Sequence, residues 1–397
     1  MSRRGPLDVA VVGAGVVGAA AALAFARDGL EVALVESREP PRWREDAPDL
    51  RVYAFAPDNA ALLDGLGVWN GVLAARAQPY RAMRVWDAAG GGELSFEADA
   101  FGRRELGWIV EHGLLVDRLW AALPAAGVRL HCPEQVEGLE RSADADSAEL
   151  LLAGGGRLRA RLVLAADGAE SQLRGLAGIE TATHDYGQNG LVAYVDHELA
   201  HQATCWQRFL PTGPLAFLPC AGHDGRRSSI VWTLPEAEAE RLLHVDEAAF
   251  LRELEHAFGG RLGTLSAVSK RVAFPLRRQL AQRYVSGRVA IAGDAAHVVH
   301  PLAGQGVNLG LRDVAALRGV LAGAQRRGAD PGGASRLQRW ERERRSENAL
   351  AAYGFDGLNR LFSNNAVAAT LLRGPLLGLA GKLPPVTHAF WRRAAGV

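Results

Sequence analysis

The chain has 397 residues, of which 48% are hydrophobic, and its formal net charge is +1. At about 150 residues per domain, this length predicts two or three domains with a large core and excludes a globally disordered chain. The balanced charge provides no field for nucleic acid, so we expect no nucleic-acid partner. The three cysteines form no CxxC pair, which argues against a disulfide framework or a metal site and fits a reducing compartment.

A strand–helix–strand unit opens the chain. Residues 7–12 (LDVAVV) have the apolar character of a buried strand, and residues 19–28 form an alanine-rich helix candidate. A second apolar strand, 31–35, ends in Glu36. The glycine-rich run 13–18 (GAGVVG) lies between the first strand and the helix. This order, and the spacing from the glycines to the acid, are typical of a dinucleotide-binding unit.

The residues of this unit have distinct roles in binding a dinucleotide. Gly13 permits the tight turn, Gly15 lets the backbone approach a pyrophosphate, and Gly18 lets the helix pack closely on the strand. The free N–H groups at the helix N-terminus attract the pyrophosphate. Because Glu36 is acidic, it favours a ribose without a 2′-phosphate. The unit therefore predicts FAD or NAD rather than NADP at this site.

Two further apolar strands each run into a short turn of glycine and aspartate. These segments supply the candidate cofactor residues Asp167, Gly168 and Arg174 after strand 162–166, and Gly293 and Asp294 after strand 288–292. An aspartate at a strand end can hold a ribityl or ribose hydroxyl. The loop that follows supplies Gly304, Gln305, Gly306, Val307 and Asn308 and leads into a helix. Its glycines allow backbone to lie against a flat ring, and the helix N-terminus stabilises the negative charge of a reduced isoalloxazine. An NAD dehydrogenase needs no such second site, so these motifs predict FAD.

The three motifs resemble those of the flavoprotein aromatic hydroxylases with the para-hydroxybenzoate hydroxylase fold. The run 293–313 (GDAAHVVHPLAGQGVNLGLRD) is similar to one branch in particular, the ubiquinone-biosynthesis hydroxylases acting on polyprenylated phenols. Segments 49–55 (DLRVYAF), 206–219 (WQRFLPTGPLAFLP) and 274–276 (FPL) resemble the same branch. The resemblance implies that NAD(P)H reduces the FAD. It also implies that O2 then forms a hydroperoxide at flavin C4a, which hydroxylates an electron-rich ring.

The resemblance also implies roles for single residues. Arg51 is expected to contact the flavin, with a surface ion pair as the alternative. Family members usually have Asn and Gln where this chain has His112 and Val116. Since the flavin supplies the chemistry, no catalytic residue is assigned. The loop 300–308 is here named the flavin loop. Its residues His300 and Pro301 are the candidates for assisting catalysis, and a structural hydrogen bond is the alternative for His300.

The order of elements predicts an α/β fold. A Rossmann-like FAD-binding domain is interleaved with an antiparallel β-sheet substrate domain and followed by a helical C-terminus. The FAD-binding domain is expected over 1–78, 100–178 and 273–340, the substrate domain over a hairpin at 79–99 and strands within 179–272, and the helical region over 341–397. Candidate substrate-pocket residues are Tyr194, Trp206, Arg208, Leu215, Phe217 and Trp232. For each aromatic residue, ordinary sheet core is the alternative.

Several questions of function stay open from the sequence. The alternatives are a flavin hydroxylase of another phenol and a non-catalytic flavin-binding accessory protein of a biosynthetic assembly. Asp8 interrupts the N-terminal apolar stretch, so we expect no signal peptide and a cytoplasmic location. Residues 361–397 are apolar and carry Lys382, which is compatible with contact at the inner-membrane surface or with core packing. Homo-oligomerisation and a ubiquinone-pathway complex are equally open.

Overall fold

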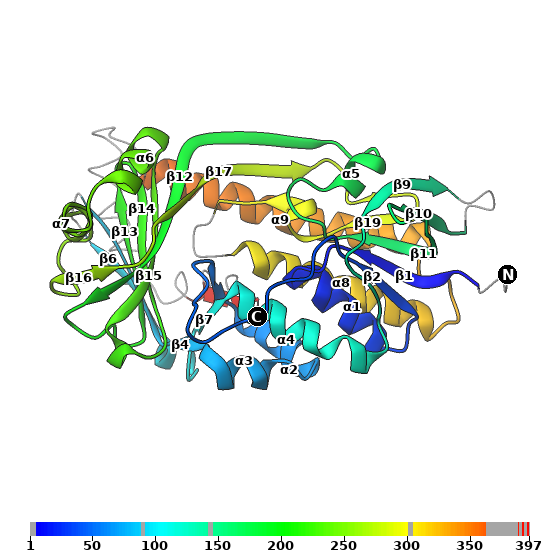
Figure 1. Cartoon of the computed structure of the whole chain (residues 1–397), viewed down its shortest axis with the longest axis horizontal. Helices are drawn as coiled ribbons and strands as arrows, with labels where there is room; N and C mark the ends of the chain where they lie inside the picture. Colours follow the sequence, from blue (N-terminus) through cyan, green and yellow to red (C-terminus); the bar gives the residue numbers. More distant parts are fainter. Residues whose placement is uncertain are drawn as a thin grey trace.

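The computed structural model describes residues 5–88, 92–141, 146–300 and 305–362, together with residues 388, 391–392 and 395–396. The predicted flavin-loop residues Pro301 and Gly304, and most of the apolar C-terminal segment, lie outside the described residues. Two large sheets occupy opposite ends of the molecule, and a smaller three-stranded sheet accompanies them (Figure 1). In the part of the chain that the structure describes, no helix is long and apolar enough to cross a membrane.

The first large sheet, here the mixed sheet, is built on parallel strands. Its order is β18-β19-β11-β1-β2-β8, and β10 and β9 extend it by antiparallel pairing next to β11. β1 pairs in parallel with both β11 and β2, and β11 pairs in parallel with β19. The strands are β1 (Leu7–Val12), β2 (Val32–Val35), β8 (Arg129–His131), β9 (Val136–Arg141), β10 (Ala148–Leu152), β11 (Arg157–Ala165), β18 (Val285–Ser286) and β19 (Val289–Ile291). The parallel strand ends therefore open at one edge of this sheet.

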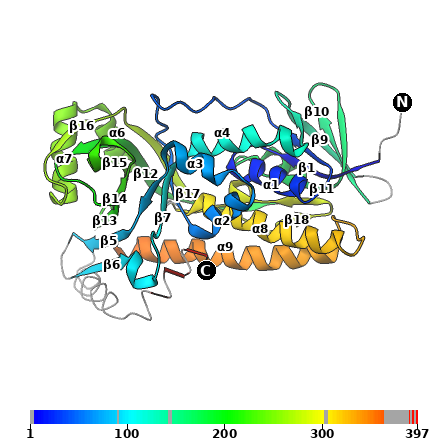
Figure 2. The ribbon, with the colours of Figure 1, turned by 90° about the horizontal axis from the view of Figure 1, so that it is seen from below.

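Helices cover the mixed sheet because parallel neighbours require crossover connections. α1 (Val16–Arg27) connects β1 to β2, and its alanines from Ala19 to Ala22 are fully buried. Small side chains let α1 lie close to the sheet and contact α4 and α8. The helices on this part of the molecule are α2 (Pro57–Gly65), α3 (Trp69–Arg76), α4 (His112–Ala122), α5 (Gln172–Leu176), α8 (Gly306–Gln325) and α9 (Ala334–Phe362). α9 runs beside α8 along one side of the molecule and reaches β14 of the second sheet (Figure 2).

The second large sheet, here the antiparallel sheet, has the order β20-β17-β12-β15-β14-β13-β5-β6, with β16 paired to β12. All of its pairs are antiparallel except β13 with β5. Its strands are β5 (Ala82–Asp87), β6 (Glu93–Glu97), β12 (Thr181–His197), β13 (Thr204–Leu210), β14 (Gly213–Pro219), β15 (Arg227–Pro235), β16 (Leu265–Val268), β17 (Val272–Ala281) and β20 (His297–Val298). The long strands β12 and β17 run from this sheet back toward the other half of the molecule (Figure 1).

One face of the antiparallel sheet packs against α6 (Glu236–His244) and α7 (Glu247–Phe258). Leu215, Phe217, Ile230 and Trp232 lie in this second core. Because side chains alternate along a strand, the residues between them face the opposite side of the sheet. That free face is turned toward the three-stranded sheet β3-β7-β4, formed by β3 (Val52–Phe55), β7 (Gly107–Glu111) and β4 (Gln78–Tyr80), which it meets in a small cluster around Cys205.

The predicted α/β fold with interleaved mixed and antiparallel sheets is confirmed. Each strand expected from the sequence is present, and the hairpin expected within 79–99 is β5 and β6. The first helix begins at Val16, earlier than the expected position 19, because the tight glycine turn already continues into helix. The hairpin β9–β10 and helix α6 were not expected from the sequence. The proposed domain boundaries stay a prediction.

Candidate functional site

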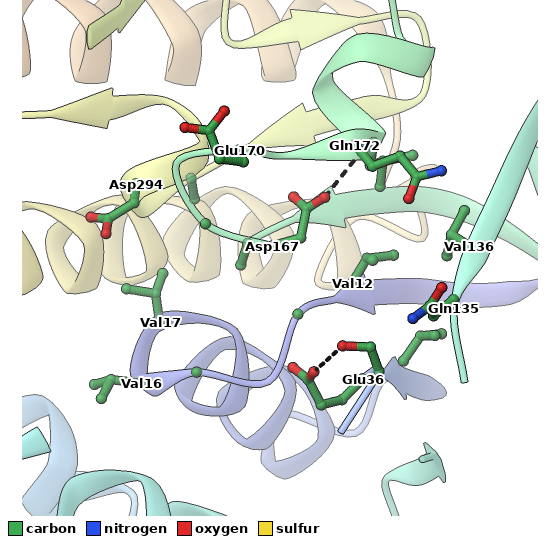
Figure 3. Close-up of a pocket in the computed structure, with 18 of the residues that line it drawn as sticks. Val12, Val16, Val17, Glu36, Gln135, Val136, Asp167, Glu170, Gln172 and Asp294 are labelled. Atoms are coloured by element: carbon green, nitrogen blue, oxygen red, sulfur yellow. Dashed lines mark hydrogen bonds between the residues drawn. The ribbon is translucent and has the colours of Figure 1, made fainter. Parts of the chain in front are cut away.

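The glycine-rich motifs converge on one cavity of about 490 Å³, which we name the cofactor cavity. Its walls come from the end of β1, the start of α1, the end of β2, the loop after β11 and the turn before β20. Figure 3 shows Glu36, Asp167 and Asp294 around this cavity, each from a separate segment. The sequence-predicted cofactor residues that line it are Gly13, Gly15, Glu36, Arg51, Asp167, Gly168, Asp294 and Val307.

The first glycine run fits a pyrophosphate for three geometric reasons. Gly13 has a φ of +92°, and a Cβ there would clash with the carbonyl of Ala166. A Cβ at Gly18 would clash with the carbonyl of Gly13, so only glycine lets α1 approach so closely. At Gly15, by contrast, a Cβ meets no described atom within 4 Å. The space at Gly15 is therefore open on the cavity side, next to the helix N-terminus that attracts an anion.

Glu36 at the end of β2 is held in place by its neighbours. Its Oε2 accepts a hydrogen bond of 2.7 Å from the backbone N–H of Ala14, and its Oε1 accepts from Ser37 Oγ at 3.0 Å. The carbonyl of Ala14 in turn accepts from Trp120 Nε1 of α4 at 2.8 Å. These bonds hold the glycine turn and the Glu36 carboxylate in a fixed arrangement, so the acid that the motif predicts for a ribose is preorganised.

The turn after β11 presents Asp167 and Gly168 to the cofactor cavity. The carboxylate of Asp167 accepts hydrogen bonds from Ser171 Oγ and from the backbone N–H of Leu173, at 3.1 Å for the second. Asp167 thereby organises the start of α5 while one side of it faces the cavity (Figure 3).

Two other predicted cofactor residues tie segments of the backbone together. Arg174 Nη1 donates to the carbonyl of Ala295 at 3.0 Å, linking the two aspartate turns. Asn308 is fully buried, and its Oδ1 accepts from the backbone N–H of Ala56 and from Asn59 Nδ2, both at 2.9 Å. Neither residue lines the cofactor cavity, and both hold together segments of the chain that form its wall.

Arg51 and Asp294 form a long ion pair in the wall of this cavity. Arg51 Nη2 lies 3.8 Å from Asp294 Oδ2, and the Arg51 side chain is 58% exposed. The guanidinium also lies 5.3 Å from the ring centroid of Tyr53. An exposed pair at this separation is weak, so Arg51 is free to reorient toward a ligand. Gly293, predicted beside Asp294, packs against Val17 at the start of α1.

The start of α8 meets the same region. Gly306 and Val307 are its first residues, and Gln305 is its buried N-cap, which makes no side-chain capping bond among the described residues. The positive end of the α8 dipole therefore lies at the wall of the cofactor cavity. Val307 lines the cofactor cavity and also a second cavity that Gly306 borders.

The second cavity, here the substrate cavity, has a volume of about 630 Å³ and lies between the free face of the antiparallel sheet and the segment 49–54. Its sheet wall consists mainly of small or apolar side chains, among them Met83, Val192, Cys205, Ala216, Leu218 and Val231. Val272 and Phe274 at one rim are 37% and 40% exposed. Arg51, Tyr53, Asp294 and Val307 line both cavities, so the two cavities meet at these residues.

Most of the predicted substrate-pocket residues do not line this cavity. Leu215, Phe217 and Trp232 lie on the opposite face, in the core under α6 and α7. Arg208 donates from Nη1 to the carbonyl of Ala257 at 2.8 Å, also on the helix side. Trp206 borders the cavity but also packs against the helix-side core. The prediction followed aromatic character and placed these residues on the wrong face of the sheet, because the apolar runs hide the alternation.

Tyr194 has a different position from the one predicted. It does not line the substrate cavity, and its hydroxyl donates to the carbonyl of Asp49 at 2.7 Å. Asp49 Oδ1 in turn accepts from the backbone N–H of Arg51 at 2.9 Å. Tyr194 thus connects the antiparallel sheet to the segment that carries Arg51.

The histidines next to the flavin loop are buried. His297 lies beside Asp313, with 2.6 Å between Nε2 and Oδ2. His300 is 1% exposed, and neither ring nitrogen has a hydrogen-bond partner among the described residues. Burial lowers the pKa of His300 to about 4, so its ring is neutral at pH 7. His300 does not line either cavity, and Pro301 lies outside the described residues.

Sequence reasoning missed several residues that line the two cavities. Tyr53 lies in the segment 49–55, whose resemblance to the family implies no role for it, and His112 stands where family members usually have Asn. Gln135 directly precedes β9 and Val136 is its first residue, in a stretch that carries no recognisable motif (Figure 3). Long-range packing brings them to the cofactor cavity, and no local signal in the sequence could have found them.

Comparison with known proteins agrees with this geometry. Residues 6–351 match the family model described as an FAD binding domain. The ubiquinone hydroxylase UbiL of Rhodospirillum rubrum is 40% identical over 393 residues, covering 98% of this chain and 89% of the relative. The 3-demethoxyubiquinol 3-hydroxylase of Escherichia coli is 39% identical over 376 residues, covering 94% of each chain. The crystal structure of p-nitrophenol 4-monooxygenase from Pseudomonas putida superimposes with a TM-score of 0.78 at 20% identity, covering 98% of both chains, and shows the shared fold.

The fold, the cofactor cavity and these matches define an FAD-dependent hydroxylase. The open backbone at Gly15, the fixed carboxylate of Glu36 and the N-termini of α1 and α8 in the cavity wall fit the groups that FAD presents. More particularly, the chain belongs to the family of FAD-dependent hydroxylases of ubiquinone biosynthesis. NAD(P)H is the usual reductant of this family.

Proposed function

We propose that this enzyme hydroxylates the aromatic ring of a polyprenylated phenol on the pathway to ubiquinone, using NAD(P)H and O2. The observation that carries the proposal is the junction of the two cavities at Arg51, Tyr53, Asp294 and Val307. FAD bound by the glycine motifs would supply the redox chemistry and the oxygen activation. A ring held in the substrate cavity would lie next to it, while the rest of the molecule stays outside the cofactor cavity.

The substrate cavity supports an apolar, ring-containing ligand. Its volume of about 630 Å³ is in the range of small-molecule sites, and its walls consist mainly of apolar side chains. The exposed rim at Val272 and Phe274 provides an apolar path out of the cavity on β17. A prenyl chain would lie along this rim, and its contact area would contribute about 25 cal/mol per Å² removed from water.

The chain's own residues have three tasks in this reaction. The glycine turn, Glu36 and the α8 N-terminus would hold FAD. The sheet face with Ala216 and Val231 would orient the ring and exclude water, which protects an activated oxygen species from unproductive release. Arg51, whose side chain is more than half exposed, would supply positive charge at the junction of the two cavities.

A membrane-surface location follows from the proposed substrate. A polyprenylated phenol resides in the bilayer, so the enzyme must receive it at the membrane surface. We place this contact at the rim formed by Val272 and Phe274, because these exposed side chains adjoin the substrate cavity. Replacing both with Ser should reduce binding to liposomes that contain a prenylphenol, and unchanged binding would contradict this location.

Gene deletion tests the proposed function. Loss of this enzyme should stop ubiquinone synthesis and cause a prenylated precursor that lacks one ring hydroxyl to accumulate. The wild-type gene should restore synthesis, whereas a Gly15→Val variant with impaired FAD binding should not. Normal ubiquinone levels in the deletion strain, in the absence of a second hydroxylase gene, would contradict the proposal.

A further inference from the structure

Tyr53 and His112 form a polar pair at the junction of the two cavities. Tyr53 lies on β3, and His112 is the first residue of α4. The Tyr53 hydroxyl oxygen lies 2.9 Å from His112 Nδ1, and the two rings meet edge to face. Tyr53 lines both cavities, whereas His112 lines the cofactor cavity. The pair is therefore placed where a bound FAD would meet it.

We propose that the Tyr53 hydroxyl fixes the tautomer of His112, so that His112 Nε2–H is a hydrogen-bond donor to FAD. A neutral imidazole has one nitrogen that donates and one that accepts, and the partner of the first nitrogen decides the role of the second. If Tyr53 O–H donates to Nδ1, the ring proton must be on Nε2. FAD presents mainly oxygen and nitrogen acceptors, which require such a donor.

The surroundings of Tyr53 favour donation by its hydroxyl. Tyr53 is 8% exposed, and burial raises the pKa of its phenol, so the group keeps its proton. Among the described residues, His112 Nδ1 is the one hydrogen-bond partner of this hydroxyl. In the opposite arrangement Nδ1–H would donate to the phenol oxygen, and the phenol proton would be buried without an acceptor from these residues. A buried unpaired donor is disfavoured.

Burial and the positive charge of Arg51 keep the His112 ring neutral. Burial, followed by the positive charge of Arg51, lowers the pKa of His112 to about 4, although Asp49 and Asp294 oppose this shift. At pH 7 the ring therefore donates one hydrogen bond without carrying a charge. A neutral donor of fixed orientation holds the cofactor without adding a second cation beside Arg51.

Nitrogen-15 NMR of the full-length FAD-bound protein, labelled at its histidines, tests this assignment. A His112→Asn variant identifies the His112 signals by their loss. We expect the wild-type spectrum to show a protonated Nε2 and an unprotonated Nδ1 at pH 7. A protonated Nδ1 on His112 would overturn the proposal, and this measurement requires no variant at Tyr53.

A double-mutant cycle on FAD affinity provides a second test that does not depend on turnover. Tyr53→Phe should raise the dissociation constant for FAD about fivefold in the wild-type background, the equivalent of one ordinary hydrogen bond. In the His112→Asn background the same change should have almost no effect, because an amide N–H donor has no tautomer to fix. An equal loss of affinity in both backgrounds would show that Tyr53 acts independently of His112 and would overturn the proposal.

Discussion

Asp313 on α8 accepts a hydrogen bond from Nε2 of His297, with 2.6 Å between the two atoms and both side chains fully buried. Arg344 of α9 donates to Oδ1 at 2.8 Å, and the backbone N–H of Gly293 donates to Oδ2 at 3.1 Å. Burial opposes ionisation, but His297 and Arg344 outweigh it and hold the pKa of Asp313 below its usual value. One carboxylate thus joins both C-terminal helices to the turn that precedes Asp294.

Replacing Asp313 with Asn should destabilise the fold. The change leaves Arg344 as a buried charge without its main partner, which typically costs about 3–5 kcal/mol. Chemical denaturation should show this loss, together with weaker FAD binding because Gly293 loses its anchor. The matched control is Glu31→Gln, which removes an exposed ion pair with Arg129 and should cost under about 1 kcal/mol. Equal stabilities for the two variants would contradict the role of Asp313.

Two glycines of the first turn should separate cofactor binding from folding. Gly15→Val should lower FAD affinity at least about tenfold, since its side chain fills the open space for the pyrophosphate. The unfolding midpoint of the FAD-free protein should change little. Gly18→Val should instead destabilise the FAD-free protein, because its Cβ clashes with the carbonyl of Gly13. Titration of FAD and thermal unfolding distinguish the two effects. Full FAD occupancy in Gly15→Val would contradict the assignment of the pyrophosphate site to this turn.

A substitution on each face of the antiparallel sheet should have a different effect. Ala216→Phe projects into the substrate cavity and should raise the KM for a prenylated phenol and increase peroxide release per NAD(P)H consumed. Phe217→Ala, one residue along the strand, should instead cost about 3–5 kcal/mol of stability because it opens the helix-side core. If Phe217→Ala changed substrate preference and Ala216→Phe did not, the assignment of faces would be wrong.

Buried His300 should make stability depend on pH. Its pKa is lowered by burial to about 4, below the value of an unfolded histidine, so the unfolded state binds the proton first. The neutral buried ring therefore contributes to the free energy of unfolding. This contribution is fully present above pH 6.5 and is lost as the pH falls toward 4, by roughly 3 kcal/mol in total. The difference in unfolding free energy between wild type and His300→Leu should therefore change by this amount between pH 7 and pH 4. A difference that is constant with pH would contradict a neutral buried ring.

Local patterns were sufficient for the fold and for most of the cofactor cavity. Glycine spacing and apolar strands predict β1, α1 and β2 because neighbouring residues determine that unit. The substrate cavity was harder to predict, since the neighbouring apolar residues Leu215 and Ala216 lie on opposite faces of a sheet whose two faces are both apolar. Tyr53 and His112 are distant in sequence, so their contact depends on how β3 meets α4. Asn308 shows the same limit, because its motif gives no indication that its side chain bonds to the backbone of Ala56.

The most direct test of the account is oxygen incorporation by the purified FAD-bound enzyme, measured with isotopically labelled O2, NAD(P)H and a prenylated phenol. Mass spectrometry should show a product that has gained one labelled oxygen atom on its ring, with one NAD(P)H consumed for each product formed. FAD-loaded enzyme that consumes NAD(P)H and O2 but yields only peroxide with a range of prenylated phenols would contradict the proposed hydroxylation.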